Sequence, residues 1–230
     1  MRYALLFILG CGLTAEAAAP ALPADAPTIL VVGDSLSAGY GINVNEGWVS
    51  LLARRLEAQG YGYRVVNASS SGETTGGGLT RLPRALDLHK PELVILELGS
   101  NDGLRGLPIA QMRSNLEAMI GLAKSRGARV LLLGMQIPPN YGPTYTSGFQ
   151  AAFVDLAKQH QLPLVPFFLD RVALRTDLMQ DDELHPNAAG QPLLLDNVWP
   201  LLEPMLKRNV NVQRKSTALR LDLSAGAPVS

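Results

Sequence analysis

The sequence has little cysteine, little histidine and no excess of either charge. It holds one cysteine, Cys11, and three histidines among 230 residues. A single cysteine excludes an internal disulfide and a thiolate metal cage. We expect neither a metal nor a cofactor. Lysine plus arginine and aspartate plus glutamate each number 20, so the formal net charge is zero. This balance gives no reason to expect a nucleic-acid or anionic-membrane partner.

The apolar run at the N-terminus is short. It covers residues 3–13, which is too few to cross a bilayer as a helix. Arg2 precedes it and the small residues AEAAA at 15–19 follow it. This pattern predicts a secretory signal peptide over residues 1–17, with cleavage as late as residue 19 as an option. We therefore expect an exported protein, periplasmic or secreted. The alternative is a lipoprotein anchored through Cys11, although Leu9 fits that cleavage pattern poorly.

The rest of the chain divides into three parts. Residues 18–27 are rich in proline and alanine and predict an extended linker. Residues 28–206 carry the apolar periodicity of one domain with a sizeable core. Residues 207–230 hold five basic side chains against one acid and lack a helical apolar stripe, which predicts a mobile C-terminal tail.

Strand and helix patterns alternate through the predicted domain. Apolar, β-branched runs at 28–32, 63–68, 92–98, 128–134 and 162–167 predict five strands. Amphipathic spacing predicts helices at 46–60, 79–88, 112–123, 149–156 and 195–205, the second of them broken at Pro83. Such alternation predicts an α/β fold with a parallel sheet and right-handed crossovers.

The first strand runs into a turn that contains a serine. Residues 28–41 read TILVVGDSLSAGYG, so Ser35 follows the carboxyl end of a buried strand. Open α/β sheets bind ligands at that edge. Ser35 is a candidate nucleophile, but serine is also common in turns. A nucleophilic serine requires a base elsewhere in the chain.

His185 is the best candidate for that base. His89 and His160 lie near the ends of predicted helices, where a structural or solvated role is expected. Asp182 lies one turn before His185, close enough to bind its Nδ1–H and fix the tautomer. The plain alternative is an aspartate that caps a turn beside an exposed histidine.

Acyl transfer also requires donors aimed at a developing oxyanion. Loops after the first three predicted strands offer the backbone N–H of Ser35, the backbone N–H of Gly72 and the side-chain amide of Asn101. The alternatives are that Gly72 merely supplies a positive φ and that Asn101 merely forms a turn.

Four short segments resemble the four conserved blocks of the SGNH (GDSL) hydrolases, in the order of that family. They are GDSL at 33–36, SG at 71–72, GSND at 99–102 and DELH at 182–185. The segments NDGLRG at 101–106, PPNYG at 138–142 and VPFF at 165–168 resemble the bacterial thioesterase I/protease I/lysophospholipase L1 (arylesterase) branch. The resemblance covers residues 28–206. Four blocks in order are much more specific than one.

The resemblance implies a three-layer α/β/α flavodoxin-like fold whose five parallel strands have the order 2-1-3-4-5. It implies Ser35 as nucleophile, His185 as base and Asp182 as its orienter, with Ser35, Gly72 and Asn101 forming the oxyanion hole. Two positions depart from the pattern, because many relatives have glycine where Ser100 and Glu183 stand. Glu183 adds a charge beside the triad, so the pH optimum is an open question.

The implied activity is hydrolysis of carboxylic esters, and the implied partner is a small-molecule acyl ester, thioester or lysolipid. We expect a monomer. Apolar loop residues at the active edge are candidates for lining an acyl groove, with ordinary loop packing as the alternative. They are Leu104, Leu107, Ile137, Pro138 and Tyr141. We predict a preference for medium to long acyl chains.

Two other functions compete with this one. An O-acetylesterase acting on cell-wall polysaccharide would use the same residues with a shorter acyl pocket. A flavodoxin-like module that binds phosphate or flavin mononucleotide would use the loop after the first strand. The second alternative leaves Asp182 and His185 without a purpose. The chain also lacks the G-x-S-x-G elbow of the α/β-hydrolases.

Overall fold

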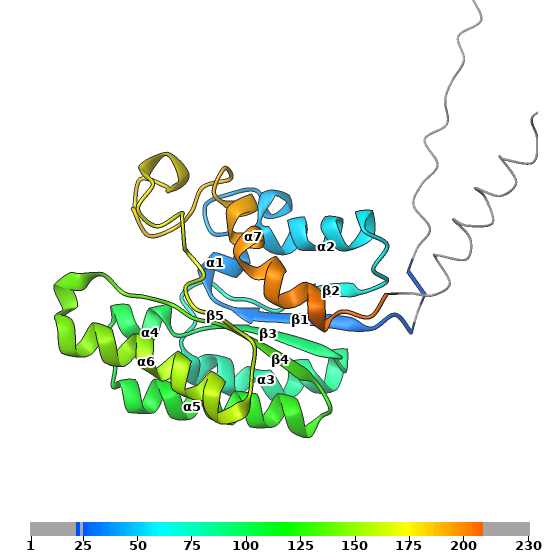
Figure 1. The fold of residues 1–230 in the computed structure, drawn as a ribbon, viewed down its shortest axis with the longest axis horizontal. Helices are drawn as coiled ribbons and strands as arrows, with labels where there is room; N and C mark the ends of the chain where they lie inside the picture. The colour runs from blue at the N-terminus through cyan, green and yellow to red at the C-terminus, as the bar shows by residue number, and fades with distance from the viewer. Residues whose placement is uncertain (1–21, 24, 209–230) are drawn as a thin grey trace, which may run out of the picture.

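The computed structural model describes residues 22, 23 and 25–208 (Figure 1). The predicted signal peptide, the linker residues 18–21 and 24, and the predicted tail from residue 209 onward lie outside the described residues. Lys207 and Arg208, the first two residues assigned to that tail, contact the domain. The Lys207 amide donates to the Tyr63 hydroxyl at 3.2 Å, and the Arg208 guanidinium lies over the Tyr61 ring.

A five-stranded parallel sheet forms the middle layer, in the predicted order β2-β1-β3-β4-β5. The strands are β1 Thr28–Gly33, β2 Arg64–Asn67, β3 Leu93–Glu97, β4 Arg129–Leu133 and β5 Leu164–Val165. β1 lies between β2 and β3, with Ile29 opposite both Val65 and Leu93. Every residue of β1 and of β3 is buried, because helices cover both faces. The predicted fold class is confirmed.

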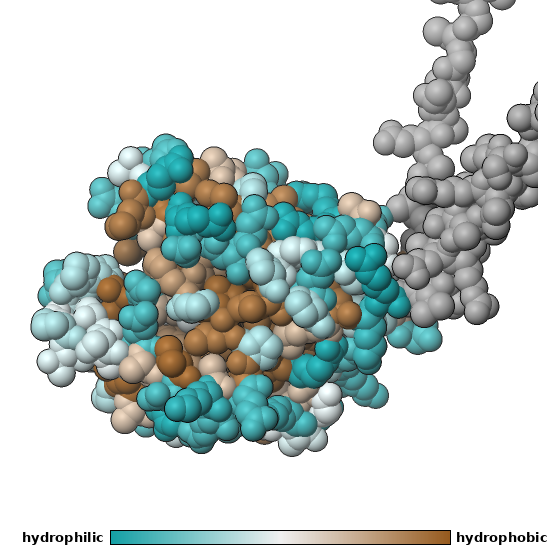
Figure 2. All heavy atoms as spheres, viewed as in Figure 1, coloured by the Kyte–Doolittle hydropathy of each residue, from teal (hydrophilic) through white to brown (hydrophobic). Residues whose placement is uncertain are grey.

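Helices cover both faces of the sheet (Figure 1). α2 Trp48–Ala58 and α7 Gln191–Leu202 form one layer, and α3 Thr75–His89, α5 Ile109–Ser125 and α6 Pro143–His160 form the other. Short 3-10 turns complete the chain at Val44–Glu46, Pro139–Tyr141, Thr176–Leu178 and Glu203–Met205. On the side of the molecule shown in Figure 2, hydrophilic side chains cover much of the helices. Apolar side chains gather across the middle of this side. No helix of the described residues is both long and apolar enough to span a bilayer.

The predicted helix over 79–88 was wrong in its start and in its break at Pro83. α3 begins at Thr75, where the Thr74 hydroxyl accepts the Gly77 amide and caps the helix. A Cβ on Gly78 would lie 2.4 Å from Leu98 Cδ1, so this glycine lets α3 approach the end of β3 closely. The helix continues through Pro83 because Leu82 and Leu86, on either side, are buried in the core.

Two short helices begin where strands end, and neither was predicted. α1 Ser35–Ala38 follows β1 and α4 Ser100–Leu104 follows β3. Each is too short to carry an apolar stripe, so its signal lies in the turn before it rather than in periodicity. Together with the segment after β2, these turns gather at the carboxyl edge of the sheet, where the candidate site lies.

Candidate active site

The turn that carries Ser35 is built by its neighbours. Asp34 caps α1, with its Oδ1 accepting the Leu36 amide at 3.0 Å. A Cβ on Gly33 would lie 2.5 Å from Glu97 Oε2 and 2.8 Å from Ser37 Oγ, so only glycine fits there. Ser35 is therefore the first residue of a helix fixed to the end of β1.

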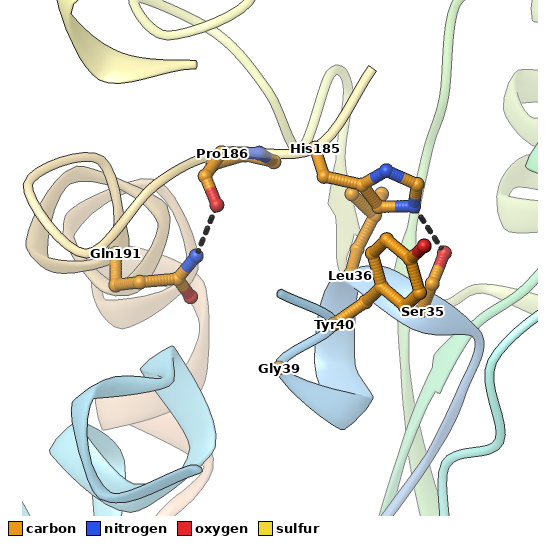
Figure 3. Close-up of a pocket in the computed structure, with 7 residues that line it drawn as sticks. All are labelled: Ser35, Leu36, Gly39, Tyr40, His185, Pro186 and Gln191. Carbon is orange, nitrogen blue, oxygen red and sulfur yellow. Dashed lines mark hydrogen bonds between the residues drawn. The ribbon is translucent and has the colours of Figure 1, made fainter. Parts of the chain in front are cut away.

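The loop before α7 brings His185 to Ser35. His185 Nε2 lies 2.8 Å from Ser35 Oγ, across 150 residues of sequence (Figure 3). On the other side of the ring, Nδ1 lies 2.6 Å from Asp182 Oδ2. The three side chains thus form one hydrogen-bonded series from carboxylate to imidazole to hydroxyl. With the Nδ1 proton held by the carboxylate, Nε2 is free to accept the serine proton.

Asp182 is held by more than the imidazole. Its Oδ1 accepts the backbone N–H groups of Leu184 and His185, both at 3.0 Å. Although burial alone would raise the pKa of Asp182, hydrogen bonds from His185 and the Leu184 amide bring that pKa down to about 2. The carboxylate is therefore charged at any pH where an esterase is normally assayed, and it favours a positive imidazole.

A tyrosine covers the imidazole. The Tyr40 ring centroid lies 4.6 Å from that of His185, with the planes tilted by 42° (Figure 3). Tyr40 follows α1, and its amide donates to the Ser35 carbonyl at 3.1 Å. This contact was not predicted. Ser35 and His185 also line a small pocket, together with Leu36, Gly39, Tyr40, Pro186 and Gln191 (Figure 3).

The predicted oxyanion donors lie in segments that bond to one another: Ser35 begins α1, Gly72 follows β2 and Asn101 lies in α4. Gly72 has a φ of 76°, the left-handed conformation expected for glycine. Asn101 Nδ2 donates to the Glu73 carbonyl at 3.0 Å and to Asp34 Oδ2 at 3.2 Å. Asn101 therefore bridges the residue after Gly72 and the residue before Ser35. The Arg105 guanidinium also binds the Gly72 carbonyl, at 3.0 Å.

The predicted groove residues occupy different environments. Ile137 is buried, and its Cγ2 would lie 2.7 Å from a Cβ on Gly103, so it packs under α4. Pro138 and Leu107 are exposed. The Tyr141 hydroxyl donates to the Leu104 carbonyl at 2.7 Å and thereby ties the 3-10 turn before α6 to the end of α4. Their part in holding an acyl chain stays a prediction.

Two buried carboxyl groups beneath the nucleophile were missed. Glu97 is fully buried; its Oε2 accepts the Ser37 hydroxyl at 2.7 Å and the Asp34 amide at 3.3 Å. Burial and the neighbouring Asp34 carboxyl raise the pKa of Glu97 well above its ordinary value. Burial likewise raises the pKa of Asp34 to about 6. For Glu97, the available signal was an acid inside the otherwise apolar run LVILEL at 93–98.

The side chains of Ser35, His185 and Asp182 are arranged for nucleophilic catalysis by a serine. No group of three or more metal-binding side chains occurs among residues 22–208, residue 24 aside. A hydroxyl, an imidazole and a carboxylate in series, at the carboxyl edge of a parallel sheet, define a serine hydrolase on a flavodoxin-like fold. The chain belongs to the GDSL-like Lipase/Acylhydrolase family, whose model matches residues 31–193. The resemblance seen in the sequence is thereby confirmed.

Relatives in this family match most of the chain. "Esterase TesA" of Pseudomonas aeruginosa is 54% identical over 183 residues, covering 80% of this chain and 91% of the relative. "Thioesterase 1/protease 1/lysophospholipase L1" of Escherichia coli K12 is 40% identical over 208 residues, covering 90% and 96%. The crystal structure of psychrotrophic esterase EstA from Pseudoalteromonas sp., inhibited by monoethylphosphonate, has a TM-score of 0.75 at 42% identity, covering 77% and 97%.

Proposed function

We propose that this protein is an exported esterase that hydrolyses carboxylic esters through an acyl-enzyme on Ser35. One observation carries the proposal: His185 joins Ser35 Oγ, at 2.8 Å, to the Asp182 carboxylate, at 2.6 Å. A serine hydroxyl is a weak nucleophile unless a base takes its proton, and this geometry supplies the base.

The reaction proceeds in two halves. Ser35 Oγ attacks the ester carbonyl carbon while its proton passes to His185 Nε2. The imidazolium then gives that proton to the departing alcohol, which leaves the acyl group on Ser35. In the second half, Nε2 takes a proton from water, and the resulting oxygen attacks the acyl-enzyme. His185 returns the proton to Ser35 as the carboxylic acid leaves. Asp182 stabilises the imidazolium in both halves.

The oxyanion formed in each half needs donors already in place. We assign this role to the Ser35 and Gly72 amides and the Asn101 side chain. Asn101 Nδ2 has two hydrogens, now given to Glu73 O and Asp34 Oδ2; the oxyanion would take the one given to Asp34. Asn101→Ala should then lower kcat by about 100-fold or more, because one such donor is worth that much. An unchanged kcat would remove Asn101 from this role.

The substrate we propose is an ester of a medium to long acyl chain, including aryl esters, acyl thioesters and lysophospholipids. The support is the names of the relatives, "Esterase TesA", "Arylesterase" and "Thioesterase 1/protease 1/lysophospholipase L1". The test is kcat/KM for p-nitrophenyl esters from acetyl to palmitoyl, with Ser35→Ala as the blank. A maximum at acetyl would favour the O-acetylesterase alternative instead.

A serine-directed phosphonate tests the nucleophile itself. We expect one equivalent to attach to Ser35 in the wild type, shown by peptide mass, and none to attach in Ser35→Ala. His185→Ala should label slowly, because Ser35 has lost its base. A yellow protein that resists labelling would point to the flavin-binding alternative.

Location and assembly are further parts of the proposal. We propose that residues 1–17 are removed on export and that the mature enzyme is a monomer. The mass of the intact protein recovered from the producing cells tests the cleavage site, and light scattering tests the monomer. A lipid-modified Cys11 at the mature N-terminus would establish the lipoprotein alternative.

A further inference from the structure

Gln180 connects the histidine loop to the nucleophile segment. Its side-chain nitrogen Nε2 donates to the Tyr40 carbonyl at 2.8 Å and to the Pro186 carbonyl at 3.1 Å. An amide nitrogen has two hydrogens, so these two bonds use both. One of these carbonyls lies five residues after Ser35 and the other belongs to the residue after His185. One side chain thus bonds both to the segment that carries Ser35 and to the segment that carries His185.

The backbone of Gln180 closes the loop that presents His185. Its amide donates to the His185 carbonyl at 2.8 Å, and its own carbonyl accepts the Glu183 amide at 3.0 Å. These bonds do not depend on the side chain. A substitution at position 180 therefore retains the donors and acceptors of the loop and removes only the connection across to Tyr40 and Pro186.

The nucleophile segment is shaped to receive this side chain. Gly41 has a φ of 74°, and a Cβ there would lie 2.0 Å from Gln180 Oε1. Glycine at position 41 thus leaves room for the amide beside the chain. On the same segment, the Tyr40 amide is bonded to the Ser35 carbonyl at 3.1 Å. A shift of the Tyr40 backbone should therefore also move Ser35, whose hydroxyl is the nucleophile.

We propose that Gln180 is a positioning residue that sets the distance between Ser35 Oγ and His185 Nε2. The inference rests on the proposed function, since it assigns a role within the same site. Proton transfer from Ser35 requires the two atoms to be within hydrogen-bond reach, and a misplacement of about 1 Å can cost about 100-fold in rate. Asp182 holds only the far side of the ring, so it does not fix this distance.

The test compares Gln180→Met, which keeps the length of the side chain but has no donor, with the wild type. Gln111→Ala is the matched control, because Gln111 is exposed and its side chain donates to Asn115, also in α5, rather than to either segment of the site. We expect kcat for p-nitrophenyl butyrate to fall about 10- to 100-fold in Gln180→Met, with KM changed by less than about threefold. The rate of phosphonate labelling at Ser35 should fall by the same factor. Gln111→Ala should match the wild type.

A second readout separates positioning from a general structural role. The downfield proton resonance of His185 Nδ1–H reports the bond to Asp182, and it should persist in Gln180→Met. Loss of this signal together with activity would show that Gln180 only supports the loop, and would overturn the proposal. So would a kcat within twofold of the wild type. If Gln180→Met does not fold, Gln180→Glu replaces it, because a carboxylate also cannot donate to either carbonyl. Wild-type labelling at Ser35 tests the proposed function separately.

Discussion

Replacing Asp182 by asparagine is the sharpest test of the proposed triad. Asp182 Oδ1 accepts two backbone amides, from Leu184 and His185, while Oδ2 faces the imidazole. Asparagine can keep both backbone bonds only if its oxygen takes the Oδ1 position. Its NH2 group then faces His185 Nδ1. Because that group donates, Nδ1 must become an acceptor, and the ring proton moves to Nε2. His185 would then donate to Ser35 instead of accepting its proton.

The other orientation of the asparagine amide has a higher free energy. It would return an acceptor to Nδ1 but aim its NH2 at two backbone N–H groups, losing both bonds at about 1 kcal/mol each and adding donor–donor contacts. The wrong tautomer is therefore favoured. We expect kcat to fall by about 10³- to 10⁴-fold, which is about 4 to 5.5 kcal/mol of transition-state stabilisation. The loss should stay smaller than in His185→Ala, which has no imidazole at all.

Asp182→Ala provides the comparison that isolates the tautomer. Alanine loses both backbone bonds, so this variant should be less stable than Asp182→Asn by about 1–2 kcal/mol in urea unfolding. It leaves His185 free to take either tautomer, so its kcat should be no lower than that of Asp182→Asn. The assay is steady-state hydrolysis of p-nitrophenyl butyrate at pH 8. An Asp182→Asn enzyme within tenfold of the wild type would refute the assignment of Asp182.

Further predictions concern the charges around the site. The pKa of Glu97 is raised in the folded protein, so its contribution to the free energy of unfolding is greatest at low pH and is lost as pH rises towards that folded value. In urea unfolding between pH 5 and 8, the free energy of unfolding of Glu97→Gln should therefore rise relative to that of the wild type, by up to about 1.4 kcal/mol per pH unit. A constant gap would contradict this. Glu183 has a φ of 54°, and Glu183→Gly should raise the free energy of unfolding by about 0.5–1 kcal/mol, because glycine adopts this conformation without strain. Ser35→Ala and His185→Ala should abolish turnover, with circular dichroism unchanged.

The sheet was predictable because its strands carry strong local signals. β1 and β3 are continuous apolar runs that end abruptly at Gly33 and near Gly99, and such runs predict buried parallel strands. The order of the strands came from the family resemblance rather than from the residues. α3 was misplaced because its first turn depends on contacts between distant segments. Asp102 accepts both the amide and the hydroxyl of Thr75, and no local pattern records that.

The candidate site was predictable only in part. Ser35, Asp182 and His185 could be named because each lies in a short motif, and the resemblance linked those motifs. The residues that hold these three side chains in place could not be identified from the sequence. Tyr40 covers His185, and Gln180 joins their loops, through contacts that cross about 140 residues of sequence. Single-sequence reasoning detects periodicity and turns, but it does not detect pairings of this separation.

The bonds of Asp182 lie almost entirely within its own turn. They run from Asp182 to Leu184 and His185, so carboxylate and imidazole form a self-contained unit of neighbouring residues. The serine belongs to a different unit, because it begins α1, which is fixed to the end of β1. On heating, the imidazole should therefore stay correctly oriented while it drifts from the hydroxyl, so that activity fails at this junction before the sheet melts. An enzyme inactivated in this way would recover on cooling without refolding.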